Sequence, residues 1–326
     1  MSRSRLTILF AFLALGLAVG AFVLLRRGSA PLPGPPAPVA ALGQFIVPPQ
    51  AGGKPLRPQL AEALGGTSPW KHRTDLIRAL SADLTADETE AMLMAMMERC
   101  PQHVDPGVHS TYMHEIALQL QNQTSVRERF ARALATIARD TKQDASTRNY
   151  AIQHLRHVWA RSAGDPGLRA ATVLTFREFT RLDPVVSVPS LLSLHLLGSA
   201  SEQRAAEGLA APLPTSANAV PAYFIPDSEI TALLDPIFTT ANSRDNLAAR
   251  VTAMRIIGER RIKSYRPLLL KTVADRSGHA VLRMAAAGAI GNIAEPEDLK
   301  FLATLQPGDE RVASALRHAL RPGVGH

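Results

Sequence analysis

Apolar residues recur three and four positions apart along most of the chain after Trp70, in short segments separated by turn residues. The pattern is clear in TDLIRALSADL, ADETEAMLMAMMERC, MHEIALQLQNQ and SVRERFARALATIARD. This spacing gathers the apolar side chains of each segment on one face of an α-helix. Helix breaks and N-caps are indicated by Pro101, Pro166, Pro184, Asp87, Ser125 and Asp144. The sequence therefore predicts short amphipathic helices joined by short loops.

A different pattern occupies the N-terminus, where residues 6–25 read LTILFAFLALGLAVGAFVLL without a charge. A helix of this length spans roughly 30 Å, the thickness of a bilayer's hydrocarbon core. A secretory signal peptide is the alternative, but its apolar region is usually shorter, and the GSAP that follows Arg26 and Arg27 is a poor cleavage site. The sequence predicts one uncleaved transmembrane helix.

The charges beside this helix give its expected orientation. Arg3, Arg5 and the terminal amine precede it, and Arg26 and Arg27 follow it. The positive-inside rule then favours a cytoplasmic N-terminus. We expect a single-pass inner (plasma) membrane protein whose body is extracytoplasmic, or periplasmic.

Two stretches rich in Pro and Ala divide the chain. Residues 28–58 have no periodic apolar face and are typical of an extended polyproline II spacer. Residues 201–226 interrupt the helical pattern in the same way. The predicted organisation is an anchor over 1–27, a linker over 28–58, helical repeats over 59–200, an interruption over 201–226 and C-terminal repeats over 227–326.

The C-terminal third repeats itself. AARVTAMRIIGERR at 248–261 matches AVLRMAAAGAIGNIA after a shift of 33 residues, and a third copy, ERVASALRHAL, places Arg311 on Arg283 after 28 residues. The first shift pairs Arg250 with Arg283, Ala253 with Ala286, Ile257 with Ile290 and Gly258 with Gly291. Second helices, YRPLLLKTVAD and PEDLKFLATL, lie between the copies.

These residues resemble HEAT repeats, particularly the short kind also seen in phycobilisome-lyase-like proteins. The resemblance is clearest over residues 246–320, and weaker copies extend it to about residues 70–180. It implies an all-α fold, an α-solenoid of helical hairpins in an armadillo-type superhelix.

Within these repeats, small Ala side chains let neighbouring helices approach closely, and we expect Gly258 and Gly291 where the first helix ends and the chain turns. An Arg at the helix start could pair with an Asp of the preceding turn, at variable spacing. The candidate pairs are Asp245 with Arg250 and Asp144 with Arg148.

Composition supports a folded, helical body. Hydrophobic residues make up 46% of the chain, charged residues 20% and aromatic residues 5%, which is globular and favours helices over a β-sandwich. The net charge of +8 indicates attraction to anionic lipid or an envelope polymer, with Arg-rich solvated helix faces as the alternative. Nucleic acid is not expected as a partner of an extracytoplasmic body.

No motif with an established catalytic mechanism is present in the sequence. There is no phosphate-binding loop, dinucleotide turn or nucleophile elbow, and His114-Glu115 lacks the second His of a zinc-protease helix. The single Cys100 excludes an internal disulfide, and covalent catalysis by it would need an activating His. We expect neither catalysis nor a cofactor.

Soft metal ligands cluster in the first half of the helical region, which would suit copper(I). They are Met92, Met94, Met96, Met97, Cys100, His103, His109, Met113 and His114. Packing explains the Met spacing better, because flexible Met side chains fill gaps in a core. His154 and His157, one helical turn apart, supply only half of a tetrahedral site. No metal site is assigned, and copper binding is kept as an alternative.

The anchor, spacer and repeats favour a membrane-anchored scaffold or adaptor that binds a protein partner at the cell envelope. In HEAT-like families the second helix of each repeat lines the concave side, so the resemblance implies a basic strip for the partner. Its residues are Lys263, Arg266, Lys271 and Lys300. The main alternative is an enzyme acting on an envelope polymer in a groove of the solenoid.

Overall fold

The computed structural model describes residues 42–43, 45, 55–65, 68–81, 83–198, 224–239, 247–306 and 308–320. These residues form α-helices and short 3₁₀ turns, with no β-strand among them. The predicted transmembrane segment and most of the predicted linker lie outside the described residues. Among the helices that are described, none combines the length and the hydropathy that crossing a membrane requires.

First and second helices alternate along the chain. The first helices are α2 (Pro58–Leu64), α4 (Ala86–Met96), α6 (Arg127–Arg139), α8 (Pro166–Phe179), α11 (Asp227–Thr239), α13 (Arg266–Ala274) and α15 (Pro296–Thr304). The second helices are α3 (Trp70–Arg78), α5 (Pro106–Leu120), α7 (Ala145–Arg161), α9 (Pro184–Leu196), α12 (Leu247–Arg260), α14 (Ala280–Ile290) and α16 (Glu310–Ala319). The 3₁₀ turns η1 (Thr124–Val126) and η3 (Lys263–Tyr265) precede α6 and α13.

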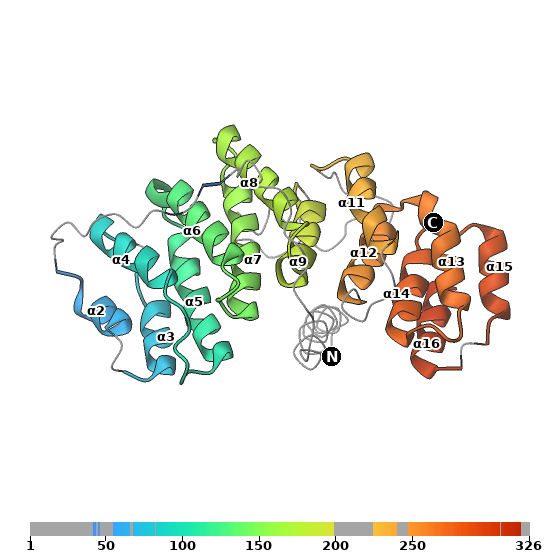
Figure 1. Cartoon of the computed structure of the whole chain (residues 1–326), viewed down its shortest axis with the longest axis horizontal. Coiled ribbons are helices and arrows are strands. Elements are labelled where there is room, and N and C mark those ends of the chain that lie inside the picture. The colour runs from blue at the N-terminus through green and yellow to red at the C-terminus, as the bar shows by residue number, and fades with distance from the viewer. Residues whose placement is uncertain are drawn as a thin grey trace.

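The second helices pack on one another in a continuous row from α3 to α16. Each first helix from α2 to α13 packs on the second helix that follows it. The result is an elongated stack of helical hairpins with α2 near one end and α15 and α16 at the other (Figure 1). The predicted all-α class with stacked hairpins is confirmed for the described residues.

The pairing of helices in the C-terminal repeats differs from the sequence-based interpretation. α13 packs closely on α14, which follows it, and makes little contact with α12, which precedes it. YRPLLLKTVAD therefore contributes the first helix of a hairpin, although the repeat pattern assigned it as a second helix. The spacing of a repeat gives its period, but only packing decides which two helices form a unit.

Part of the predicted linker packs on the helical body. Leu42 and Phe45 are buried against α6. The backbone N–H of Phe45 donates to the Thr136 hydroxyl at 3.0 Å, and the Arg139 guanidinium donates to the Leu42 carbonyl at 3.2 Å. These residues of the linker are held by the body and do not extend from it as a free spacer.

The predicted helix starts are right in part. Asp144 caps α7 by accepting from the Thr147 N–H at 2.8 Å. Asp87 is wrong as a cap, because Thr85 forms a capping box with Glu88, and Asp87 falls in the first turn of α4. Ser125 is also wrong, since it lies in η1 before α6 begins. The predicted breaks hold: Pro101 lies between α4 and α5, and Pro166 and Pro184 are the first residues of α8 and α9.

The two repeat glycines both allow close packing of neighbouring helices. A Cβ on Gly258, inside α12, would lie 2.8 Å from the Ala289 Cα, and one on Gly291 would lie 3.1 Å from the Ala319 Cα. Gly291 caps α14 in the right-handed region with φ −56°. The positive φ after α12 belongs to Arg261, at 56°. The expectation that these glycines lie at the helix end is therefore wrong for Gly258, which is inside α12, and right for Gly291, which follows the last residue of α14.

Candidate binding site

Three buried arginines repeat one structural role. Each is the fourth residue of a second helix, and its Nε donates to a carbonyl oxygen in the last turn of the preceding first helix, where the helix itself provides no partner. The pairs are Arg73 with Ala63 (2.6 Å), Arg148 with Ala138 (2.9 Å) and Arg283 with Val273 (3.1 Å). These arginines join the two helices of a hairpin.

A repeat arginine does pair with an aspartate, as predicted, but the aspartate is a different one. Arg148 pairs with Asp183, the N-cap of α9, at 2.6 Å, whereas Asp144 caps its own helix. The ion pair of Arg148 is therefore made with the next second helix and not with the preceding turn. Arg311, the second residue of α16, is exposed and pairs with Asp309, so its alignment with Arg283 is wrong. Asp245 lies outside the described residues.

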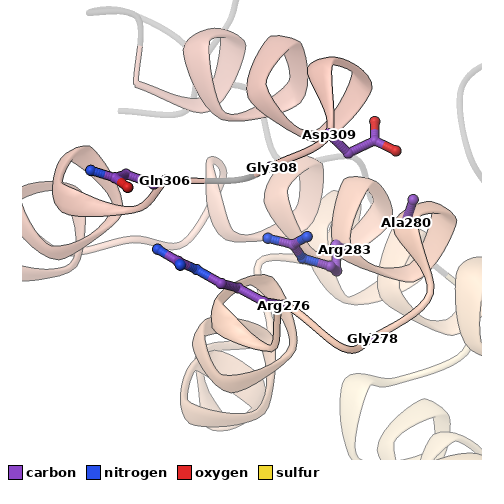
Figure 2. Close-up of a pocket in the computed structure, with 7 residues that line it drawn as sticks. All are labelled: Arg276, Gly278, Ala280, Arg283, Gln306, Gly308 and Asp309. Carbon is purple, nitrogen blue, oxygen red and sulfur yellow. The ribbon is translucent and has the colours of Figure 1, made fainter.

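A pocket of about 340 Å³ opens between two loops of the C-terminal repeats, one joining α13 to α14 and the other joining α15 to α16. Its lining residues are Arg276, Gly278, Ala280, Arg283, Gln306, Gly308 and Asp309. The guanidinium groups of Arg276 and Arg283 point to the same side, and the carboxylate of Asp309 points to the other (Figure 2).

The carboxylates near this pocket have partners of their own. Asp309 pairs with the Arg311 side chain at 2.8 Å, and this hydrogen bond lowers the pKa of Asp309 to about 2. Asp275 accepts from the Ser277 hydroxyl at 2.6 Å, and that bond lowers the pKa of Asp275. Arg276 is exposed and makes no ion pair within the described part of the chain. Arg276 therefore offers a positive charge at the pocket, which suits a carboxylate or another small anion.

The four residues of the predicted basic strip have different surroundings. Lys263, Lys271 and Lys300 are exposed. Arg266 is partly buried and forms ion pairs with Glu295 and, at 3.3 Å, with Asp298 at the start of α15. Arg266 thus connects α13 to α15, and the predicted concave placement loses its basis because α13 is a first helix.

The Met, Cys and His residues that could have formed a copper site lie in different environments. Met92, Met96 and Met113 belong to the core, with Met94 and Met97 packed against it. His103 is exposed, whereas His109 is buried. The Cys100 thiol contacts the carbonyls of Pro101 and Val104 at 3.6 Å. Among the described residues, no three His, Cys, Asp or Glu side chains form a group that could hold a metal ion.

The structure does bring His114 and His154 together across α5 and α7. His114 Nδ1 lies 2.9 Å from His154 Nε2, and the Tyr150 ring lies 4.9 Å from the His114 ring between centroids. His157 lies further along α7, with its ring centroid 6.3 Å from that of His154. Burial is the largest cause that lowers the pKa of each of these three histidines.

Two arrangements of polar residues were not predicted from the sequence. The pocket combines Arg276 and Asp309 from loops more than thirty residues apart, and a second polar cluster joins His195 on α9 to Arg260 on α12. The repeat pattern drew attention to Arg283 as a recurring residue, but the residues of loops carry no period. Only the stacking of hairpins brings them side by side.

Comparison with known proteins identifies the repeats. Residues 234–321 match the family model of HEAT repeats. Among solved structures, the chain is similar to human deoxyhypusine hydroxylase in complex with glycerol, with a TM-score of 0.31 and 18% identity over 80% of this chain and 93% of that chain. No curated protein matches the sequence. The family match confirms the resemblance drawn from the sequence: residues 234–321 are HEAT repeats.

Proposed function

We propose that this protein is a non-catalytic, membrane-tethered scaffold whose C-terminal HEAT repeats bind a protein partner through an acidic group seated in the Arg276 pocket. The observation that carries the proposal is the exposed guanidinium of Arg276 at the rim of this pocket, beside the buried Arg283. Stacked repeats offer extended surfaces of the kind that repeat proteins use to hold partners.

The chemistry of the pocket favours a carboxylate of an acidic segment. A guanidinium presents N–H donors in a planar fork that matches the two oxygens of a carboxylate. Arg283 is 4% exposed and held in place by its bond to the Val273 carbonyl, so one side of the pocket is fixed before a ligand arrives. Exposed Lys263, Lys271 and Lys300 on the same repeats add positive charge that attracts an acidic surface.

The protonation state of the Cys100 thiol supports the proposal that the protein is not an enzyme. Burial, followed by Asp144 and Asp105, raises the pKa of Cys100, which keeps it protonated and therefore weakly nucleophilic. The membrane part rests on the uncharged residues 6–25, with the cytoplasmic N-terminus and extracytoplasmic body that the flanking charges favour.

The test compares two charge reversals in the full chain. Partners are captured by cross-linking and pull-down from solubilised membranes, and the affinity of the recovered partner is then measured for Arg276→Glu and Arg181→Glu. Arg181 is the matched control, because it is also exposed and is also the second residue after a first helix, in the loop between α8 and α9.

We expect Arg276→Glu to weaken binding at least about tenfold, because it places a negative charge in the pocket, and Arg181→Glu to leave it within about twofold. Equal binding by the two variants would remove the pocket from the interface. If repeated captures recover no stoichiometric partner, the proposed scaffold function is contradicted.

A further inference from the structure

A buried polar cluster joins the two lobes of the described solenoid, the N-terminal lobe from α2 to α9 and the C-terminal lobe from α11 to α16. α9 packs on α12 at this joint, and α11 contacts both helices. Arg260 donates from Nε to His195 Nδ1 at 2.9 Å and from Nη2 to the His195 carbonyl at 3.2 Å. Its Nη1 donates to the Ile225 carbonyl at 2.7 Å and to Asp227 at 2.9 Å.

The hydrogen bonds fix the protonation state of His195. A guanidinium Nε carries a hydrogen and cannot accept one, so Nδ1 of His195 is the acceptor of this contact. The single proton of the neutral ring therefore resides on Nε2, which donates to a carboxylate oxygen of Glu259 at 2.7 Å. Both ring nitrogens are engaged, and the side chain of His195 is fully buried.

A second proton on this ring would have to bind Nδ1. That nitrogen would become a donor facing the donor of Arg260, so the hydrogen bond would be lost and two positive charges would meet in a buried place. Burial is the largest influence on His195 and lowers its pKa, while Glu259 acts in the opposite direction and Arg260 and Arg255 add to the lowering.

The surrounding charges come mainly from the C-terminal lobe. Arg255 pairs with Glu259 at 2.6 Å, and Asp227, at the start of α11, pairs with Arg260 at 2.9 Å. Glu259, Arg260 and Arg255, which influence the pKa of His195, all lie on α12. The ring of His195 therefore lies between the Arg260 guanidinium and the Glu259 carboxylate.

We propose that this joint is an acid-sensitive hinge, in which protonation of His195 in acid breaks its hydrogen bond with the Arg260 Nε and lets the two lobes change their relative position. The inference does not depend on the proposed partner, because it concerns the connection between the lobes and not the Arg276 pocket.

The test measures the distance between the lobes in the full chain in detergent micelles. Cys100→Ser removes the native thiol, and Lys142→Cys and Lys300→Cys, both at exposed positions, carry spin labels for electron–electron distance measurements at pH 7.5 and pH 5.5. His195→Gln is the main variant, because its amide can donate and accept like the neutral ring but does not titrate in this range. His72→Gln is the control, since His72 is an exposed histidine that also contacts a glutamate, Glu62.

We expect the distance distribution of the labelled parent and of His72→Gln to broaden and shift at pH 5.5, and that of His195→Gln to remain as it is at pH 7.5. The hinge is refuted by a parent distribution that is the same at both pH values, or by a His195→Gln variant that responds to acid as the parent does.

Hydrogen–deuterium exchange of the parent decides the matter if His195→Gln does not fold. After correction for intrinsic exchange, faster exchange in α9 and α12 at pH 5.5 with α14 unchanged supports the hinge. A uniform increase over all helices overturns it.

Discussion

At the scale of single residues, the described structure depends on arginines whose charge is used inside the fold. Arg73, Arg148 and Arg283 are each buried and bonded to a carbonyl at a helix end, so they are structural residues despite their charge. This reduces the share of the +8 net charge that is available to attract partners.

Arg148→Met tests this role. The substitution removes the Arg148 donor from the Ala138 carbonyl and from the Asp183 carboxylate, and we expect a loss of about 2–3 kcal/mol in the free energy of unfolding. Arg311→Met, which removes only an exposed ion pair, should change it by no more than about 0.5 kcal/mol. Urea unfolding followed by circular dichroism measures both, and similar losses would argue against the structural role of Arg148.

Substituting alanine at two glycines, Gly258 and Gly288, should change the stability in opposite directions. Gly258→Ala places a Cβ 2.8 Å from the Ala289 backbone, and we expect overpacking to cost about 1–3 kcal/mol. Gly288→Ala lies inside α14 with no atom within 4 Å of the new Cβ, so it should stabilise by about 0.5–1 kcal/mol. Thermal melts of the two variants decide the point, and a Gly258→Ala variant as stable as the parent would show that α12 and α14 can move apart without cost.

At the scale of helices, the contact between α5 and α7 carries the histidine pair. His154 is 2% exposed and touches His114, and burial, followed by His114 and His157, lowers the pKa of His154 well below its usual value. The pair therefore packs in its neutral form, and it is a point at which acid weakens the interface between two helices.

The sign of the pH effect follows from this shift. In the unfolded chain His154 titrates near pH 6.5, so below that pH the unfolded state binds a proton that the folded state does not accept. The stabilisation is present above about pH 6.5 and is lost as the pH falls, by up to about 1.4 kcal/mol per pH unit for each such proton. His154→Leu should flatten the fall in stability between pH 7 and pH 5, as measured by urea unfolding at each pH, and a variant with an unchanged slope would contradict this.

At the scale of the whole molecule, the solenoid presents its repeats in a row, and the proposed membrane anchor determines which compartment they meet. A reporter fused to the C-terminus measures this directly. We expect activity of an export-dependent reporter and no activity of a cytoplasmic one, because residues 6–25 and their flanking charges favour a cytoplasmic N-terminus. Activity of the cytoplasmic reporter alone would reverse the orientation and make nucleic acid a partner worth testing.

The sequence by itself determined the helical class and the HEAT repeats, because a period of three to four residues and a repeat of about thirty are properties of the chain that packing does not alter. It also identified Asp144 as a cap and Met92 and Met96 as core residues, since both predictions depend on neighbours close in sequence. Tertiary structure decided that α13 pairs with α14, that Gly258 and Gly291 admit a neighbouring helix, that Arg148 reaches Asp183, and that His195 meets Arg260. Each of these contacts joins residues from different helices, and the distances between them depend on how the hairpins stack, which no local pattern of apolar and polar residues records.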